Sequence, residues 1–103
     1  WLFLEALIDA GVHIGLSRPM ASTLAQQTML GSVQMARQTG RHLAELRNMV
    51  TSPGGTSAAA LHELESGRLR TVLSEAVWAA FRRTVELGDQ LEAALAPEDG
   101  KPG

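Results

Sequence analysis

Apolar residues recur along this chain at the three- and four-residue spacing of helix faces. Near the start, Phe3, Leu7 and Ala10 stand at i, i+4 and i+7. This spacing predicts a helix over about residues 1–14, and the glycines from Gly11 to Gly15 are expected to end it.

A second, longer helical pattern follows. Ser17 has the residue type of an N-cap and is followed two residues later by a proline suited to a first helical turn. The pattern runs to about Thr39 and predicts a helix that ends at Gly40. The small residues Ala25 and Gly31 within it are expected to allow another helix to approach closely.

Three further helices are predicted in the second half of the chain, with a turn at Pro53-Gly54-Gly55 between the first two of them. Their expected bounds are about His42–Val50, about Thr56–Ser66 with Gly67 as its cap, and Leu69 to Leu87 with a fraying continuation toward Leu95.

The fold class is therefore all-α, a bundle of about five helices. The apolar stripes of the second and last helices are wider than one short bundle needs, so we expect two copies to intertwine as a homodimer, mainly through these helices. Residues 1–96 are expected to form one domain, and the Pro-, Gly- and charge-rich residues 97–103 a disordered tail. Neither a strand-like run nor a Gly-x-Gly-x-x-Gly sequence is present, so a dinucleotide-binding βαβ unit is expected to be absent from this chain.

Composition narrows the function classes. Apolar residues make up 45% of the 103 residues and aromatic residues only 4%, so Leu, Ala, Val and Met must form the interior. The net charge of −2 argues against a nucleic-acid binder. The chain has no cysteine, which excludes disulfides and thiolate chemistry and fits a cytoplasmic location. No apolar run reaches the roughly 20 residues that span a bilayer. The chain has no initiator Met and no signal-peptide pattern, and we expect it to be the downstream part of a longer protein.

The segment from Val50 to Ser57 carries the clearest candidate chemistry. It places hydroxyl side chains and two adjacent glycines directly before an apolar helical run. Free amides at a helix start attract anions, and glycines let a ligand approach the main chain. A carboxylate or phosphate would suit such a site. The alternative is that Ser52 or Thr56 caps the helix while the glycines form a simple turn.

Residues 4–88 resemble the C-terminal, dimer-forming domain of pyrroline-5-carboxylate reductase, the last enzyme of proline biosynthesis. Three blocks carry this resemblance, and the third is the most specific. They are Glu5-Ala6-Leu7-Ile8-Asp9-Ala10-Gly11-Val12 with Gly15-Leu16-Ser17-Arg18; Ala25-Gln26-Gln27-Thr28 with Leu30-Gly31; and Glu45-Leu46-Arg47-Asn48-Met49-Val50-Thr51-Ser52-Pro53-Gly54-Gly55-Thr56-Ser57 with Ala60-Leu61, Leu64-Glu65 and Gly67.

The resemblance implies an enzyme that reduces 1-pyrroline-5-carboxylate to L-proline with NADPH or NADH. An N-terminal Rossmann domain, absent from this chain, would hold the cofactor. This chain would supply the homodimer interface and the substrate loop, and alone it would be inactive. Family members also build rings of dimers. No metal, nucleic acid or membrane is implied.

The resemblance also implies roles for individual loop residues. The substrate-binding set is Val50, Ser52, Gly54, Gly55, Thr56 and Ser57. Within it, Val50 and Ser52 would flank the substrate ring. The amides near Gly55 and Thr56 would bind its carboxylate, and Ser57 would offer its hydroxyl to the imine as the candidate catalytic group.

The sequence departs from the family pattern at two places. The family usually has Thr at the position of Ser57, and an acidic or amide residue followed by His-Pro where this chain has Arg41-His42-Leu43. Ser57 keeps the hydroxyl but loses the stiffness of a β-branched side chain, and Thr56 could serve instead. These departures leave open an alternative, a non-catalytic helical dimerisation module of a reductase paralogue.

Other polar residues point more weakly to chemistry. Glu5 and Asp9 share a helix face, but such pairs are usually solvated or bonded to cations. His13, His42 and His62 do not stand at metal-ligand spacing.

Overall fold

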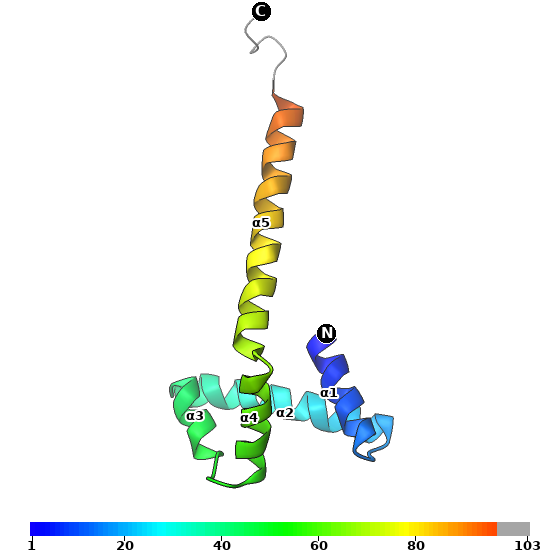
Figure 1. The fold of residues 1–103 in the computed structure, drawn as a ribbon, viewed down its shortest axis with the longest axis vertical. Helices are drawn as coiled ribbons and strands as arrows, with labels where there is room; N and C mark the ends of the chain where they lie inside the picture. The colour runs from blue at the N-terminus through cyan, green and yellow to red at the C-terminus, as the bar shows by residue number, and fades with distance from the viewer. Residues whose placement is uncertain (97–103) are drawn as a thin grey trace, which may run out of the picture. The chain divides into compact units, whose positions relative to one another are not determined.

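The computed structural model describes residues 1–96, which form five α-helices and no strand (Figure 1). The all-α prediction is confirmed. The helices are α1 (Leu2–His13), α2 (Arg18–Thr39), α3 (Leu43–Met49), α4 (Thr56–Ser66) and α5 (Leu69–Leu95). They belong to two compact units, of which the first covers Trp1–Ser52 and the second begins at Pro53. The predicted disorder of residues 97–103 lies outside the described residues.

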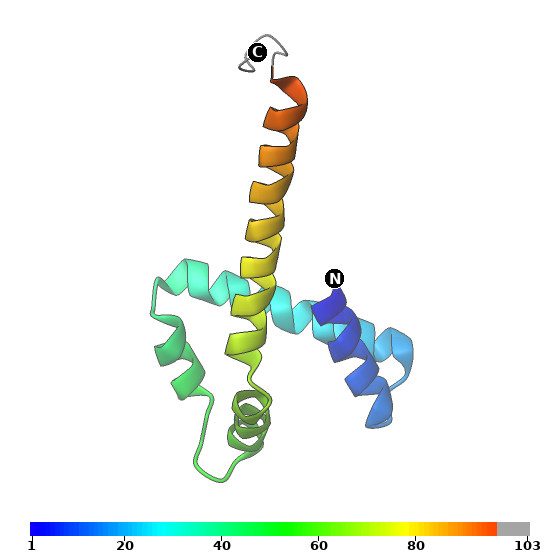
Figure 2. The ribbon, with the colours of Figure 1, turned by 45° about the horizontal axis from the view of Figure 1, so that its top comes forward.

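In the first unit, α1 folds back beside the N-terminal part of α2 (Figure 2). The two helices meet closely where Gly11 faces Ala21. A Cβ added to Gly11 would lie only 3.0 Å from the Cβ of Ala21, so only glycine fits there without a shift. Ala21 and Ala25 are the only buried apolar residues among residues 1–96, at 3% and 7% exposure. Small residues therefore bring these helices together.

Local features of the sequence determine the conformation of the turn between α1 and α2. Gly11 does not end α1, which continues to His13; the chain reverses at Gly15, whose φ is 114°. Ser17 is the N-cap of α2, as predicted, and its Oγ accepts a hydrogen bond from the amide of Met20 at 3.3 Å. Arg18 pairs with Asp9 across the turn at 3.1 Å.

The end of α2 also follows the sequence prediction. Gly40 is its C-cap with φ 64°, a left-handed conformation that glycine adopts without strain. The close approach expected at Gly31 is not made within the first unit, where a Cβ on Gly31 would meet nothing within 4 Å.

In the second unit, α4 lies at the N-terminal end of α5 (Figure 1). Gly67 is the C-cap of α4, as predicted, but its φ is −77° and the left-handed residue of the junction is Arg68, with φ 62°. A Cβ at position 67 would lie 3.2 Å from the carbonyl oxygen of Glu63, a tight contact.

The last helix is the longest element. α5 has 27 residues and passes through Gly88 to Leu95, which makes it about 40 Å long at 1.5 Å per residue. The continuation past Leu87 is therefore a regular helix. None of the helices within residues 1–96 is both long and apolar enough to cross a membrane.

The Gly11–Ala21 approach predicts a stability difference. Gly11→Val should lower the free energy of unfolding by about 1–3 kcal/mol, because the added methyl groups must separate α1 from α2. Ala6→Val introduces the same side chain at an exposed position on another face of α1 and should cost less than about 1 kcal/mol. Urea unfolding followed by circular dichroism at one protein concentration measures both; equal losses would contradict the assigned contact.

Candidate functional site

The segment between α3 and α4 is the candidate site that the sequence indicates. Val50 is the C-cap of α3, and Gly55 is the N-cap of α4. The chain turns at Pro53 and Gly54, as predicted. Residues 50–52 end the first unit and Pro53 begins the second.

The first part of this segment is fixed to the end of α3. The hydroxyl of Thr51 donates to the carbonyl oxygen of Arg47 at 2.6 Å, and the amide of Val50 donates to the same oxygen at 3.3 Å. The amide of Thr51 bonds to the carbonyl of Asn48, also at 3.3 Å. Carbonyls that a helix end would leave without partners are thus satisfied by the segment itself.

Sequence reasoning gave Thr51 and Arg47 no role. Thr51 stands four residues after Arg47, the spacing at which a Thr hydroxyl reaches a helical carbonyl, so the signal was present. The Nε of Arg47 is buried without a hydrogen-bond partner within residues 1–96. Because its hydroxyl is bonded to the end of α3, Thr51 contributes to the position of its neighbours Val50 and Ser52, the two residues expected beside the substrate.

Glycine is required at only one of the two adjacent positions by backbone conformation. Gly54 has φ 74°, in the left-handed region that costs other residues roughly 1–2 kcal/mol. Gly55 has φ −84° and ψ 176°, an extended conformation open to any residue. Gly55 has no side chain that could cover the main chain before α4.

The start of α4 has free main-chain donors. Its first backbone bond runs from the amide of Ala59 to the carbonyl of Gly55 at 3.1 Å, and no side chain caps the helix. Within residues 1–96, no protein oxygen accepts a hydrogen bond from the amides of Thr56, Ser57 or Ala58. Neither Ser52 nor Thr56 caps α4, so that alternative is wrong.

Three of the four hydroxyl residues of the segment are exposed. Ser52, Thr56 and Ser57 are all exposed, and the last two occupy the first two positions of α4. Amides and hydroxyls at a helix start can together bind a small carboxylate. The candidate chemistry is orientation of an anion, since the segment contains no carboxylate or imidazole.

The residues that depart from the family pattern have local partners. Arg41 lies 3.7 Å from Glu45 and donates to the sulfur of Met49 at 3.1 Å. His42 is the N-cap of α3, and its Nδ1 accepts a hydrogen bond from the amide of Ala44 at 3.1 Å. His42 thus stabilises a helix start that lacks the usual proline.

The weaker candidates take structural roles or show no cluster. Asp9 is bonded to Arg18, one of the outcomes expected for the Glu5 and Asp9 face. Within residues 1–96, no three His, Asp or Glu residues are grouped closely enough to hold a metal ion.

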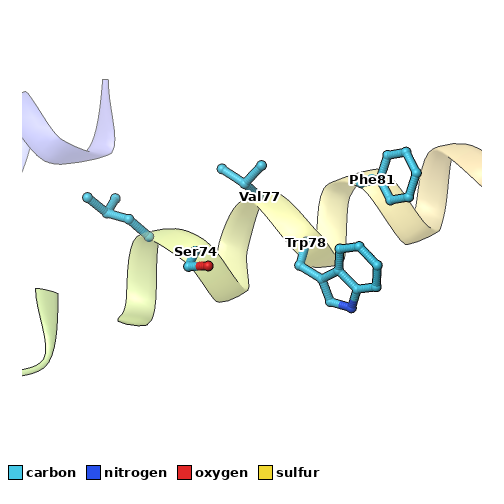
Figure 3. Close-up of a pocket in the computed structure, with 5 residues that line it drawn as sticks. Ser74, Val77, Trp78 and Phe81 are labelled. Carbon is cyan, nitrogen blue, oxygen red and sulfur yellow. The ribbon is translucent and has the colours of Figure 1, made fainter. Parts of the chain in front are cut away.

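A second kind of candidate surface lies along α5. Figure 3 shows Ser74, Val77, Trp78 and Phe81 along this helix, where they line a shallow, mostly apolar depression together with Leu73. The rings of Trp78 and Phe81 stack with centroids 5.5 Å apart. No lining residue is titratable, so this surface suits association and not acid–base chemistry.

Comparison with known proteins relates this arrangement to one family. The family model for pyrroline-5-carboxylate reductase dimerisation matches residues 1–87. The chain is 49% identical to pyrroline-5-carboxylate reductase of Glycine max and 47% identical to that of Synechocystis. Each match covers 84% of this chain, but only 32% and 33% of the relative.

Solved structures of similar fold belong to the same family. The fold matches Plasmodium falciparum pyrroline carboxylate reductase, which has NADP bound, with a TM-score of 0.82 and 39% identity. It matches pyrroline-5-carboxylate reductase of Coxiella burnetii with a TM-score of 0.80 and 44% identity. Both matches cover 84% of this chain and about a third of the other chain, 33% and 32%. The chain therefore belongs to the pyrroline-5-carboxylate reductase dimerisation family.

Proposed function

We propose that this chain is the C-terminal part of an enzyme that reduces 1-pyrroline-5-carboxylate to L-proline with NADPH or NADH, and that it supplies the homodimer interface and the substrate loop. The observation that carries the proposal is the start of α4, which follows two glycines, has no side-chain cap and lies inside the family match. The relatives named above are pyrroline-5-carboxylate reductases, and this chain spans about a third of their length.

The cofactor is assigned to a part of the enzyme outside this chain. Residues 1–96 contain no strand and so no Rossmann unit. The reduced nicotinamide would supply the hydride, and we assign none of the residues of this chain to its binding.

The loop residues would orient the substrate. The amides near Gly55 and Thr56 bind its carboxylate, while Val50 and Ser52 lie beside its ring; Gly54 provides the left-handed turn between them. The hydroxyl of Ser57 donates toward the imine side. Hydride transfer to a cationic imine needs orientation and exclusion of water more than a strong base, so a loop without a general base fits this role.

The second part of the proposal is a homodimer built mainly from α2 and α5. Large apolar side chains stand exposed along both helices, including Leu24, Leu30 and Val33 on α2 and Leu73, Val77 and Phe81 on α5. Burial of such faces is the main driving force for stable association. A dimer that assembles in the cytoplasm is consistent with the cysteine-free composition.

The reductase proposal predicts activity that depends on the missing part. The full-length protein, with the upstream portion that its relatives possess, should oxidise NADPH when pyrroline-5-carboxylate is added. The 103-residue chain alone should show no turnover. Absorbance of NADPH measures both reactions, and a folded full-length protein without turnover would support the alternative of a non-catalytic dimerisation module.

The loop proposal predicts the effect of removing two hydroxyls. Thr56→Ala combined with Ser57→Ala in the full-length enzyme should reduce kcat/KM by roughly 10- to 100-fold, the loss typical of hydrogen bonds to charged groups. Ser66→Ala, at the exposed C-terminal end of the same helix, should leave kcat/KM unchanged. Ser57→Thr should retain activity, because it restores the residue usual in the family. Wild-type kinetics in the double variant would remove these hydroxyls from the mechanism.

The dimer proposal predicts the mass of the protein in solution. Sedimentation at micromolar concentration should show a dimer or a multiple of it, and Val77→Glu should shift it toward monomer by placing charge in the apolar face of α5. Arg82→Glu, on a different face of the same helix, should leave the mass unchanged. A wild-type protein that sediments only as monomer would contradict the assignment.

A further inference from the structure

The apolar face of α5 extends beyond the part of the chain that defines the family. The family match ends at residue 87, but α5 continues as a regular helix to Leu95. The additional segment, residues 88–95, adds about two helical turns.

One row of side chains, all apolar except Thr84, crosses this boundary. Its members follow each other at spacings of four and three residues, the repeat of a coiled-coil seam. They are Leu73, Val77, Ala80, Thr84, Leu87, Leu91 and Ala94, with Leu95 beside the last of them. Successive helical residues turn by about 100°, so the seam occupies one face of α5 over its whole length.

The seam becomes narrower in the additional segment. Before residue 87, Trp78, Phe81 and Val85 widen the apolar face on one side. After residue 87, Asp89 and Glu92 occupy that side. Gln90 lies on the other side of the row. A narrow apolar seam bordered by charged or polar residues is the pattern that packs against one other helix.

Among residues 53–96, nothing covers the seam at this end. α4 lies at the opposite, N-terminal end of α5 (Figures 1 and 2). Leu87, Leu91 and Leu95 are 50%, 60% and 72% exposed. Three leucines of one row so exposed to water favour association.

We propose that residues 88–95 extend the dimer interface, with Leu91 and Leu95 packed against a second copy of this chain. This inference rests on the homodimer proposed above. A second copy is the occupant that the pattern favours, because the seam is continuous with the helix face inside the family's dimerisation region. A two-fold dimer also presents the same narrow seam twice.

The test compares two glutamates introduced into the same helical turn of the full chain. Leu91→Glu places a charge in the seam, whereas Ala93→Glu places it on the other side of α5. Sedimentation equilibrium should show a dimer dissociation constant raised roughly 10-fold or more by Leu91→Glu and unchanged by Ala93→Glu. Leu91→Met, which keeps an apolar side chain of similar volume, should retain the wild-type constant.

The outcomes separate this inference from the one it rests on. A wild-type dimer whose dissociation constant is unaffected by Leu91→Glu would overturn the role of residues 88–95 and leave the homodimer standing. A wild-type protein without dimers would overturn both.

A cross-linking measurement identifies the occupant. The chain contains no cysteine, so Leu91→Cys provides a single site for a benzophenone maleimide label. Illumination should give a covalent product of twice the chain mass of 11.0 kDa, and Ala93→Cys should give much less of it. Cross-linking from position 91 only within one chain would overturn the proposal.

Discussion

Burial of apolar surface is the constraint on which the rest of this structure depends. Within residues 1–96, only Ala21 and Ala25 are buried apolar residues, and an alanine contributes little surface to a core. Most of the exposed large apolar side chains lie instead on α2 and α5. Helices of this length gain most of their stability from packing an amphipathic face, so these faces need a partner surface.

This constraint connects stability to the candidate site. Few interactions hold the loop between α3 and α4. They are the hydrogen bond of the Thr51 hydroxyl and two backbone hydrogen bonds of 3.3 Å, and Gly54 adds a left-handed turn. A loop of this kind keeps its shape only if the helices at its two ends are themselves held in place. In the proposed enzyme, assembly would therefore also fix the substrate loop.

The helices could be predicted because their ends are determined locally. Ser17 and Gly40 act through bonds and dihedral angles of their own segments, which the sequence reveals without knowledge of the fold. The role of Gly11 could not be predicted, since it depends on Ala21 of the following helix. The left-handed residue after α4 was also unexpected, because Arg68 adopts it while the neighbouring glycine does not.

The site was predictable to a similar extent. Adjacent glycines and hydroxyls before an apolar run indicated an anion site, and the uncapped amides of α4 agree with that pattern. The anchoring of the loop by Thr51 was missed, although its spacing from Arg47 is visible in the sequence. The identity of the proposed substrate comes from the resemblance to the family and not from the physical pattern, because a helix start can bind many carboxylates.

The dependence of folding on association is tested most directly by the concentration dependence of thermal unfolding. If the apolar faces of α2 and α5 are buried against a second copy, the unfolding midpoint must rise with protein concentration, because dimerisation stabilises only the folded state. We predict a steady rise over about a hundredfold range of concentration around the dissociation constant. A midpoint that stays constant over that range, in a protein that unfolds reversibly, would contradict the account.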